Sequence, residues 1–124
     1  MARSSKGAFS ESEGWSVDVD TNTTNGTIIV AITGPSFYVD FWATDLRTLV
    51  QAAAYLRSEK STQPFRLGNF SSGLPVEFTT FGEGQSIFVA VSEAEGSVMS
   101  YKLSPSDLAH LGSAFENAAG QLRV

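Results

Sequence analysis

The single histidine of the chain, His110, is the first residue to test for acid–base or nucleophilic chemistry. It lies in the segment SDLAHLGSAF, whose apolar spacing predicts a helix, and at that spacing it stands outside the stripe of Leu108 and Leu111. It also forms no sequence cluster with a serine that could act as a nucleophile. The chain has no cysteine, and therefore no thiolate for attack on a substrate. We interpret His110 as a solvated helix residue and predict that the protein is not an enzyme.

Two segments have part of the pattern of an ion or phosphate site. The segment DVDTNTTNG, residues 18–26, is rich in oxygen ligands but lacks the glutamate that closes a calcium loop at its twelfth position. Alternation along a strand already accounts for Asp18 and Asp20. The segment FGEGQ has a G-x-G but no phosphate-binding lysine, and it lies between two predicted strands. The sequence therefore predicts no metal site and no cofactor.

Asp40 is the carboxylate best placed for acid–base chemistry, because FYV and FW flank it in a strand predicted to be central. In an apolar pocket its pKa would rise, and a pocket around Asp40 between helices and sheet would suit a small molecule. The two halves of the sequence have matching segments, described below, and that match places Lys102 in the second half at the position equivalent to Asp40. An ion pair between Asp40 and Lys102 is therefore the structural alternative.

The first half of the chain predicts four strands followed by a helix. Phe9 opens the first strand, and the segments GWSVDVDT, TIIVAIT and SFYVDFW form the next three. Asn25-Gly26 and Gly34-Pro35 are the turn signals between them. The helix begins at Thr44-Asp45 and ends in the polar segment RSEKSTQP. Its predicted apolar stripe is Leu46, Leu49, Val50, Ala53 and Leu56.

The second half predicts the same order. Phe70 opens the first strand, the segments PVEFTTFG, SIFVAVS and SVMSYKL form the next three, and a helix follows over SPSDLAHLGSAFENAAGQL. Ser104 is the expected N-cap of this helix, with Pro105 at the first helical position and an acid, Asp107, three residues after the cap. The predicted apolar stripe of the helix is Leu108, Leu111, Phe115, Ala118 and Leu122.

Matching segments indicate that the two halves are copies of one unit. TDLRTL, from Thr44, returns as SDLAHL from Ser106, and IVAIT, from Ile29, returns as FVAVS from Phe88. One helix is too small to cover the apolar face of four strands, whereas two units that share a sheet bury a common core. We therefore predict one α+β domain over residues 1–124, with an antiparallel sheet, two helices packed on one face and a pseudo-twofold tandem ββββα repeat over about 7–60 and 65–124.

Strand alternation also predicts which side chains face away from the helices. The predicted inner set is Val17, Val30, Ile32, Val39, Phe41, Phe78, Val89, Val91, Tyr101 and Leu103. The predicted outer set, which we expect to bind a partner, is Asp18, Asp20, Ile29, Tyr38, Asp40, Trp42, Glu77 and Phe88, with Lys102 beside them. Soluble proteins seldom leave such an apolar patch bare. The alternatives are covering by the segment SEKSTQPFRLGN or by the N-terminal arm, and self-association as a homodimer.

Charge and hydropathy narrow the class of partner. The net charge of −5, from 13 acidic and 8 basic residues, disfavours nucleic acid, whose binding relies on lysine and arginine. The longest apolar runs, IIVAI and IFVAV, are far shorter than a membrane span, and no apolar segment follows MARSSKGAFSESEG as in a secretory signal. We predict a cytoplasmic protein that does not contact membranes and that docks on a protein partner with a basic surface.

The tandem ββββα order resembles that of the plant Whirly proteins and of paired PUR repeats, in element order only. That resemblance implies binding of single-stranded nucleic acid, with Tyr38, Trp42 and Phe88 as stacking platforms. The groove of such a protein is positive, whereas here Asp18, Asp20, Asp40 and Glu77 would line it. The sequence favours a non-catalytic inhibitor, immunity or accessory protein; single-stranded nucleic-acid binding and small-molecule binding are the alternatives.

Overall fold

Ten elements follow one another in the computed structural model, which describes residues 5–22, 26–35, 37–57, 64–70, 73, 75–81, 85–91 and 98–122. The first half contains strands β1 (Ser5–Ser12), β2 (Trp15–Asn22), β3 (Thr27–Gly34) and β4 (Phe37–Ala43), followed by helix α1 (Arg47–Arg57). The second half contains β5 (Phe65–Asn69), β6 (Pro75–Phe81), β7 (Gln85–Val91) and β8 (Val98–Lys102), followed by helix α2 (Pro105–Gln121). The fold is α+β. Strand β5 ends at Asn69 and so precedes Phe70, where the sequence predicted the first strand of the second half to begin.

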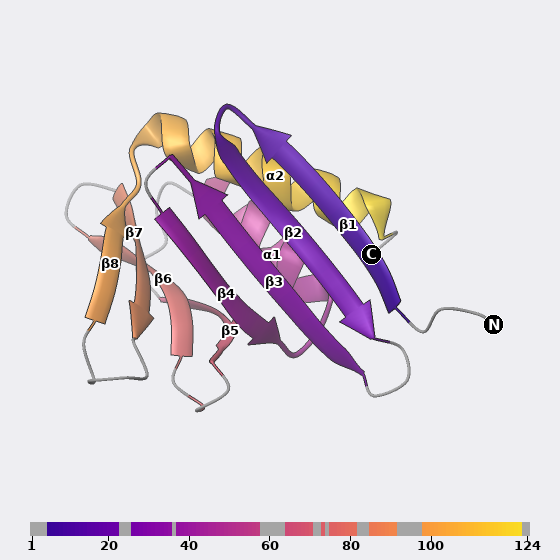
Figure 1. The fold of residues 1–124 in the computed structure, drawn as a ribbon. Coiled ribbons are helices and arrows are strands. Elements are labelled where there is room, and N and C mark those ends of the chain that lie inside the picture. The colour runs from indigo at the N-terminus through magenta and orange to yellow at the C-terminus, as the bar shows by residue number, and fades with distance from the viewer. Residues whose placement is uncertain are drawn as a thin grey trace.

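Each strand pairs with its neighbour in the chain, so the eight described strands form one antiparallel sheet in the order β1 to β8. The first four strands form a continuous ladder, while β4 and β5 share one pair of directly opposed residues, Trp42 and Asn69. Gly68 allows β5 to approach at this joint, because a Cβ atom there would clash with the carbonyl oxygen of Trp42. In Figure 1 the long strands β1–β4 and the strands β5–β8 form the two parts of the curved sheet.

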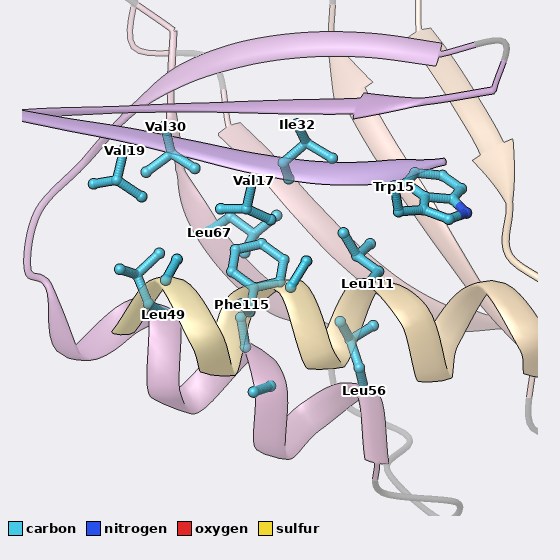
Figure 2. Close-up of a cluster of buried hydrophobic side chains, with 14 of the residues drawn as sticks. Trp15, Val17, Val19, Val30, Ile32, Leu49, Leu56, Leu67, Leu111 and Phe115 are labelled. Carbon is cyan, nitrogen blue, oxygen red and sulfur yellow. The ribbon is translucent and has the colours of Figure 1, made fainter. Parts of the chain in front are cut away.

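Both helices lie behind the long strands in Figure 1, and the main apolar core fills the space between them and the sheet. Figure 2 shows side chains from β2 and β3 directed at the helices, where Leu49 and Phe115 meet them. The described members of the predicted inner set are buried or half-buried: Val17, Val30, Ile32, Val39, Phe41, Phe78, Tyr101 and Leu103. Strand alternation therefore identified the core.

Aromatic side chains join the two halves at both ends of this core. At one end Phe78 of β6 packs between helices, with ring centroids 6.0 Å from Tyr55 of α1 and 6.4 Å from Phe115 of α2. At the other end Tyr101 of β8 lies 5.7 Å from Trp15 and 5.3 Å from Phe37, both from the first half. Such ring pairs bury large apolar areas, so aromatic side chains of both halves contribute to one core.

Side chains at the start of each helix bind its first free backbone N–H groups. Ser104 accepts a hydrogen bond from the backbone N–H of Asp107, and Asp107 accepts one from the N–H of Ser104, which completes the predicted capping box. At α1, Asp45 accepts from the backbone N–H of Arg47 at 2.8 Å. One prediction for α1 is wrong: the side chain of Val50 is 45% exposed, because the buried stripe of α1 runs through Leu49, Ala52, Ala53 and Leu56 instead.

The pairing of β7 differs from the prediction, which set Phe88 on the opposite face from Phe78. Position 88 of β7 lies opposite Phe78 of β6 and Tyr101 of β8, which face the helices, whereas Val89 lies opposite Glu77. Directly opposed residues belong to the same face of a sheet. The segment SIFVAV is apolar at both alternating sets of positions, so its sequence could not fix the register. The side chains of residues 85–91 lie outside the described part of the structure.

Candidate interaction surface

The solvent side of β1–β4 carries the predicted binding residues of the first half; we call it the outer face and define it by Phe9, Glu11, Asp18, Asp20, Ile29, Tyr38, Asp40 and Trp42. Rows of directly opposed residues cross it, among them the row from Glu11 through Ser16 and Thr33 to Tyr38 and two others. Of the two others, one runs from Phe9 through Asp18 and Ala31 to Asp40, and the second from Asp20 through Ile29 to Trp42. Opposed Cβ atoms in such rows are about 5 Å apart, so these side chains form one continuous surface.

Large apolar side chains of the outer face are open to solvent. Trp42 is 47% exposed, Tyr38 57%, Ile29 39% and Phe9 53%. They are exposed because the alternate residues of the same strands point to the helices and form the core. Scattered exposed apolar residues are ordinary on a protein surface, but here four of them share one side of four adjacent strands.

The charged side chains of the outer face are all acidic. Asp18, Asp20 and Asp40 are exposed, Glu11 extends the set along β1, and residues 7–22, 26–35 and 37–43 contain neither lysine nor arginine. The face therefore combines apolar contact area with a single sign of charge. That combination attracts cations and repels phosphate.

Tyr38 and Asp40 are neighbours on this face. The phenol Oη of Tyr38 donates a long hydrogen bond, 3.5 Å, to Oδ2 of Asp40. The pKa of Tyr38 is raised above 10.0, first by partial desolvation, then by the charge of Asp40 and this hydrogen bond, and then by the charge of Asp18. A phenol is protonated near neutral pH at its ordinary pKa, and here it is a hydrogen-bond donor among carboxylates.

Two predicted site residues lie apart from the outer face. Glu77 is half-buried on β6 and lies opposite Arg66 of β5, so a positive charge adjoins it in the sheet. Position 88 pairs with Phe78 of β6, and its side chain lies outside the described part of the structure. Conversely, the exposure of Phe9 was not predicted. The inner residues of β1 are Ala8 and Ser10, too small and polar to reveal which parity of the strand is buried.

Two alternatives were open for Asp40, a small-molecule pocket around it and an ion pair with Lys102. Asp40 is exposed on β4, whereas Lys102 lies on β8 with three strands between them, so the two are not neighbours in the sheet. The described hollow lies elsewhere, on the solvent side of the helices. It is a groove of about 420 Å³ between α1 and α2, spanned by an ion pair between Arg57 and Glu116. Its lining residues are Val50, Ala53, Ala54, Arg57, Glu116, Ala119 and Gly120.

His110 has a serine partner that the sequence did not suggest. Its Nδ1 lies 2.9 Å from Oγ of Ser12, which comes from the end of β1. Nearby, Asp107 accepts a hydrogen bond of 3.0 Å from Nε1 of Trp15 and also binds the backbone of Ser104. The carboxylate that would orient the imidazole in a Ser-His-Asp array is therefore engaged in capping. These contacts fasten the β1–β2 hairpin to the start of α2.

Within the described ranges, no group of three histidine, aspartate or glutamate side chains is arranged to hold a metal ion. Neither described helix has the length and apolar character needed to span a bilayer. Comparison with protein-family models, curated proteins and solved structures finds no match to this chain.

Proposed function

We propose that this protein is a small, non-catalytic binding protein that docks on a basic surface of a protein partner through the outer face. One observation carries the proposal: the exposed side chains of Phe9, Ile29, Tyr38 and Trp42 share a surface on which every described charge is negative. An inhibitor, immunity or accessory protein that occupies the site of a cationic partner fits this description. Such a role needs no cofactor or metal.

The aromatic and acidic groups complement the chemistry of arginine. A guanidinium stacks on the face of an indole or phenol and pairs with a carboxylate through parallel hydrogen bonds. On the outer face, Asp40 lies between Tyr38 and Trp42 along β4, so a carboxylate is flanked by two aromatic side chains. The carboxylates also steer a basic partner toward the face, which makes association faster at low salt.

Self-association through the outer face is disfavoured by the same charges. A twofold dimer brings a surface against its own copy, so Asp18, Asp20 and Asp40 would meet like charges. Like-charge juxtaposition costs several kcal/mol at an interface. We therefore assign the outer face to a different protein. A chain without cysteine needs no oxidising compartment, and we place its action in the cytoplasm.

Duplication of a ββββα unit is part of the same proposal. It is supported by the element order, in which four strands and a helix occur twice, and by the matching segments TDLRTL and SDLAHL. The Whirly- and PUR-like alternative, single-stranded nucleic-acid binding, has the exposed aromatic side chains in its favour. It has the charge of the outer face against it.

The test compares defined ligands on the purified full chain. We expect an arginine-rich peptide to bind more tightly than a lysine-rich peptide, with an affinity that falls as salt is raised, and an oligothymidylate not to bind. Tyr38→Ala combined with Trp42→Ala leaves the net charge unchanged and is expected to weaken peptide binding at least about tenfold, as for loss of interface anchors.

The matched control is Val50→Ala, which removes an exposed apolar side chain from α1, on the other side of the molecule. It is expected to bind the peptide like the wild type. Equal binding by the double variant and the wild type would show that net charge alone attracts the peptide, and would refute the outer face as the site. Tighter binding of the oligothymidylate than of the arginine-rich peptide would favour the nucleic-acid alternative.

A further inference from the structure

The strand β1 forms one edge of the sheet. It pairs with β2 along its whole length, and its other side has no strand neighbour in the described structure. In Figure 1 it is the outermost of the long strands, with α2 passing behind it. An open edge of this kind presents N–H and C=O groups that another strand can bind.

One side chain occupies the middle of this edge. The backbone N–H of Phe9 donates to Oε1 of Gln121 at 3.0 Å, and Nε2 of Gln121 donates to the carbonyl oxygen of Phe9 at 2.6 Å. Gln121 is the last residue of α2, far from Phe9 in the chain. A carboxamide has the same donor and acceptor as a peptide group, so Gln121 binds Phe9 as a residue of a neighbouring antiparallel strand would.

We propose that β1 is a strand-docking edge for β1 of a second copy of this chain, and that the Gln121 carboxamide keeps it closed. When the carboxamide swings away, the N–H and C=O of Phe9 are free to form a hydrogen-bonded pair with Phe9 of the second copy. The two sheets then continue across a twofold axis. This inference does not rest on the proposed function, because it uses the edge of the sheet rather than the outer face as its contact.

The sequence of β1 suits pairing with itself. A twofold axis at Phe9 places Gly7 opposite Glu11 of the second copy and Ala8 opposite Ser10. No like charges are directly opposed, and the small residues Ala8 and Ser10 avoid crowding on the helix side. Backbone groups two residues apart point to the same side of a strand, so Gly7 and Glu11 add further hydrogen-bonding positions on either side of Phe9.

The hydrogen bonds to Gln121 determine the fraction of molecules in which the Phe9 backbone groups are free to pair with a second copy. Two hydrogen bonds to an exposed carboxamide keep an edge closed in a ratio of about ten to one. A dimer needs two open edges, so removing the carboxamide from both copies is expected to lower the dimer dissociation constant by about a hundredfold.

The experiment measures the mass of the full chain by sedimentation over a range of concentrations. Gln121→Ala is expected to dimerise at about a hundredfold lower concentration than the wild type. Gln121→Glu retains the length of the side chain but loses the donor to the Phe9 carbonyl, and is expected to behave similarly. At concentrations where both are monomeric, the amide of Phe9 is expected to exchange its hydrogen faster in Gln121→Ala than in the wild type.

The matched control adds Glu11→Pro to Gln121→Ala. Proline at this position removes an N–H that faces the open edge rather than β2, so the ladder within the chain is kept. The double variant is expected to return to the mass of the wild type.

The inference is refuted if both Gln121 variants have the concentration dependence of the wild type, if association persists with Glu11→Pro, or if the wild type is already fully dimeric. Binding of the arginine-rich peptide is expected to be unaffected by Gln121→Ala, so the two proposals fail separately.

Discussion

The outer face depends on individual side chains whose charge states are coupled. Tyr38 illustrates this, because its phenol is exposed to solvent and yet lies in the field of Asp40 and Asp18. In such a setting the carboxylates disfavour the phenolate, and the phenol remains a hydrogen-bond donor to any partner.

Replacing Asp40 with Asn is expected to lower the pKa of Tyr38 toward 10.0. Burial, the largest cause of the raised pKa, stays in place, but the adjacent negative charge is removed. The ultraviolet absorbance of the phenolate follows this titration, and Tyr38→Phe identifies the signal of Tyr38 among the three tyrosines. Asp20→Asn removes the same charge from the same face and is expected to have a smaller effect. Equal shifts in the two Asn variants would contradict a specific coupling of Tyr38 to Asp40.

Single residues also show where sequence patterns reached their limit. The exposure of Tyr38 and Trp42 was predicted, since strict alternation in SFYVDFW defines one buried parity. The pairing of position 88 with Phe78 was not predicted, because both alternating sets of positions in SIFVAV are apolar. The contact between Ser12 and His110 could not be predicted, because it joins residues that only the tertiary fold brings together.

At the scale of the element, the start of α2 is the best-defined local structure. Asp107 caps the helix and also binds Trp15 of β2, so one carboxylate fixes both the helix end and its docking on the sheet. Burial opposes ionisation of this carboxyl, but hydrogen bonds from Ser104 and Trp15 outweigh that effect, and the pKa of Asp107 is lowered below 3.8.

A lowered pKa in the folded state links Asp107 to acid stability. Its contribution is present above the pKa of the unfolded chain and is lost as pH falls through the lower pKa of the folded state. Asp107→Asn is expected to reduce the free energy of unfolding by about 1 kcal/mol at neutral pH, and by less in acid. Urea unfolding at both pH values measures this difference. Asp18→Asn, an exposed position without a cap, serves as the control; an equal loss there would argue against capping as the cause.

The helices show how far element-level patterns extend. The capping signature of α2 was predicted from Ser104, Pro105 and Asp107, because it depends only on residues close in sequence. The stripe of α1 was predicted with Val50 included, and the structure exposes Val50. Several apolar faces are available on the segment LVQAAAYL, and the position of α2 and the sheet selects among them.

At the scale of the whole molecule, the joint between β4 and β5 connects the two halves of the sheet. A side chain at Gly68 would meet the backbone of Trp42, which cannot move aside without shifting β4. The close approach at this joint therefore depends on glycine.

Gly68→Ala is expected to lower the free energy of unfolding by about 1–3 kcal/mol, the usual cost of overpacking. Gly120→Ala is the matched control, since a Cβ atom there has open space around it. This control lies in α2 and is expected to raise stability by up to about 1 kcal/mol, because alanine favours helices. Urea midpoints give both values. If Gly68→Ala unfolded at the same midpoint as the wild type, the close joint would be in doubt.

The fold class, the cap of α2 and the burial of Val17, Ile32 and Phe41 could be predicted from the amino-acid sequence. These features follow from turn residues, local hydrogen bonds and alternation within one strand, all of which act over a few residues. The pairing of position 88 with Phe78, the exposure of Val50 and the hydrogen bonds between Phe9 and Gln121 depend on the tertiary fold. Each of these features depends on which distant segment of the chain packs alongside. The free energy of such packing comes from residues far apart in sequence, so no pattern within a few residues predicts it.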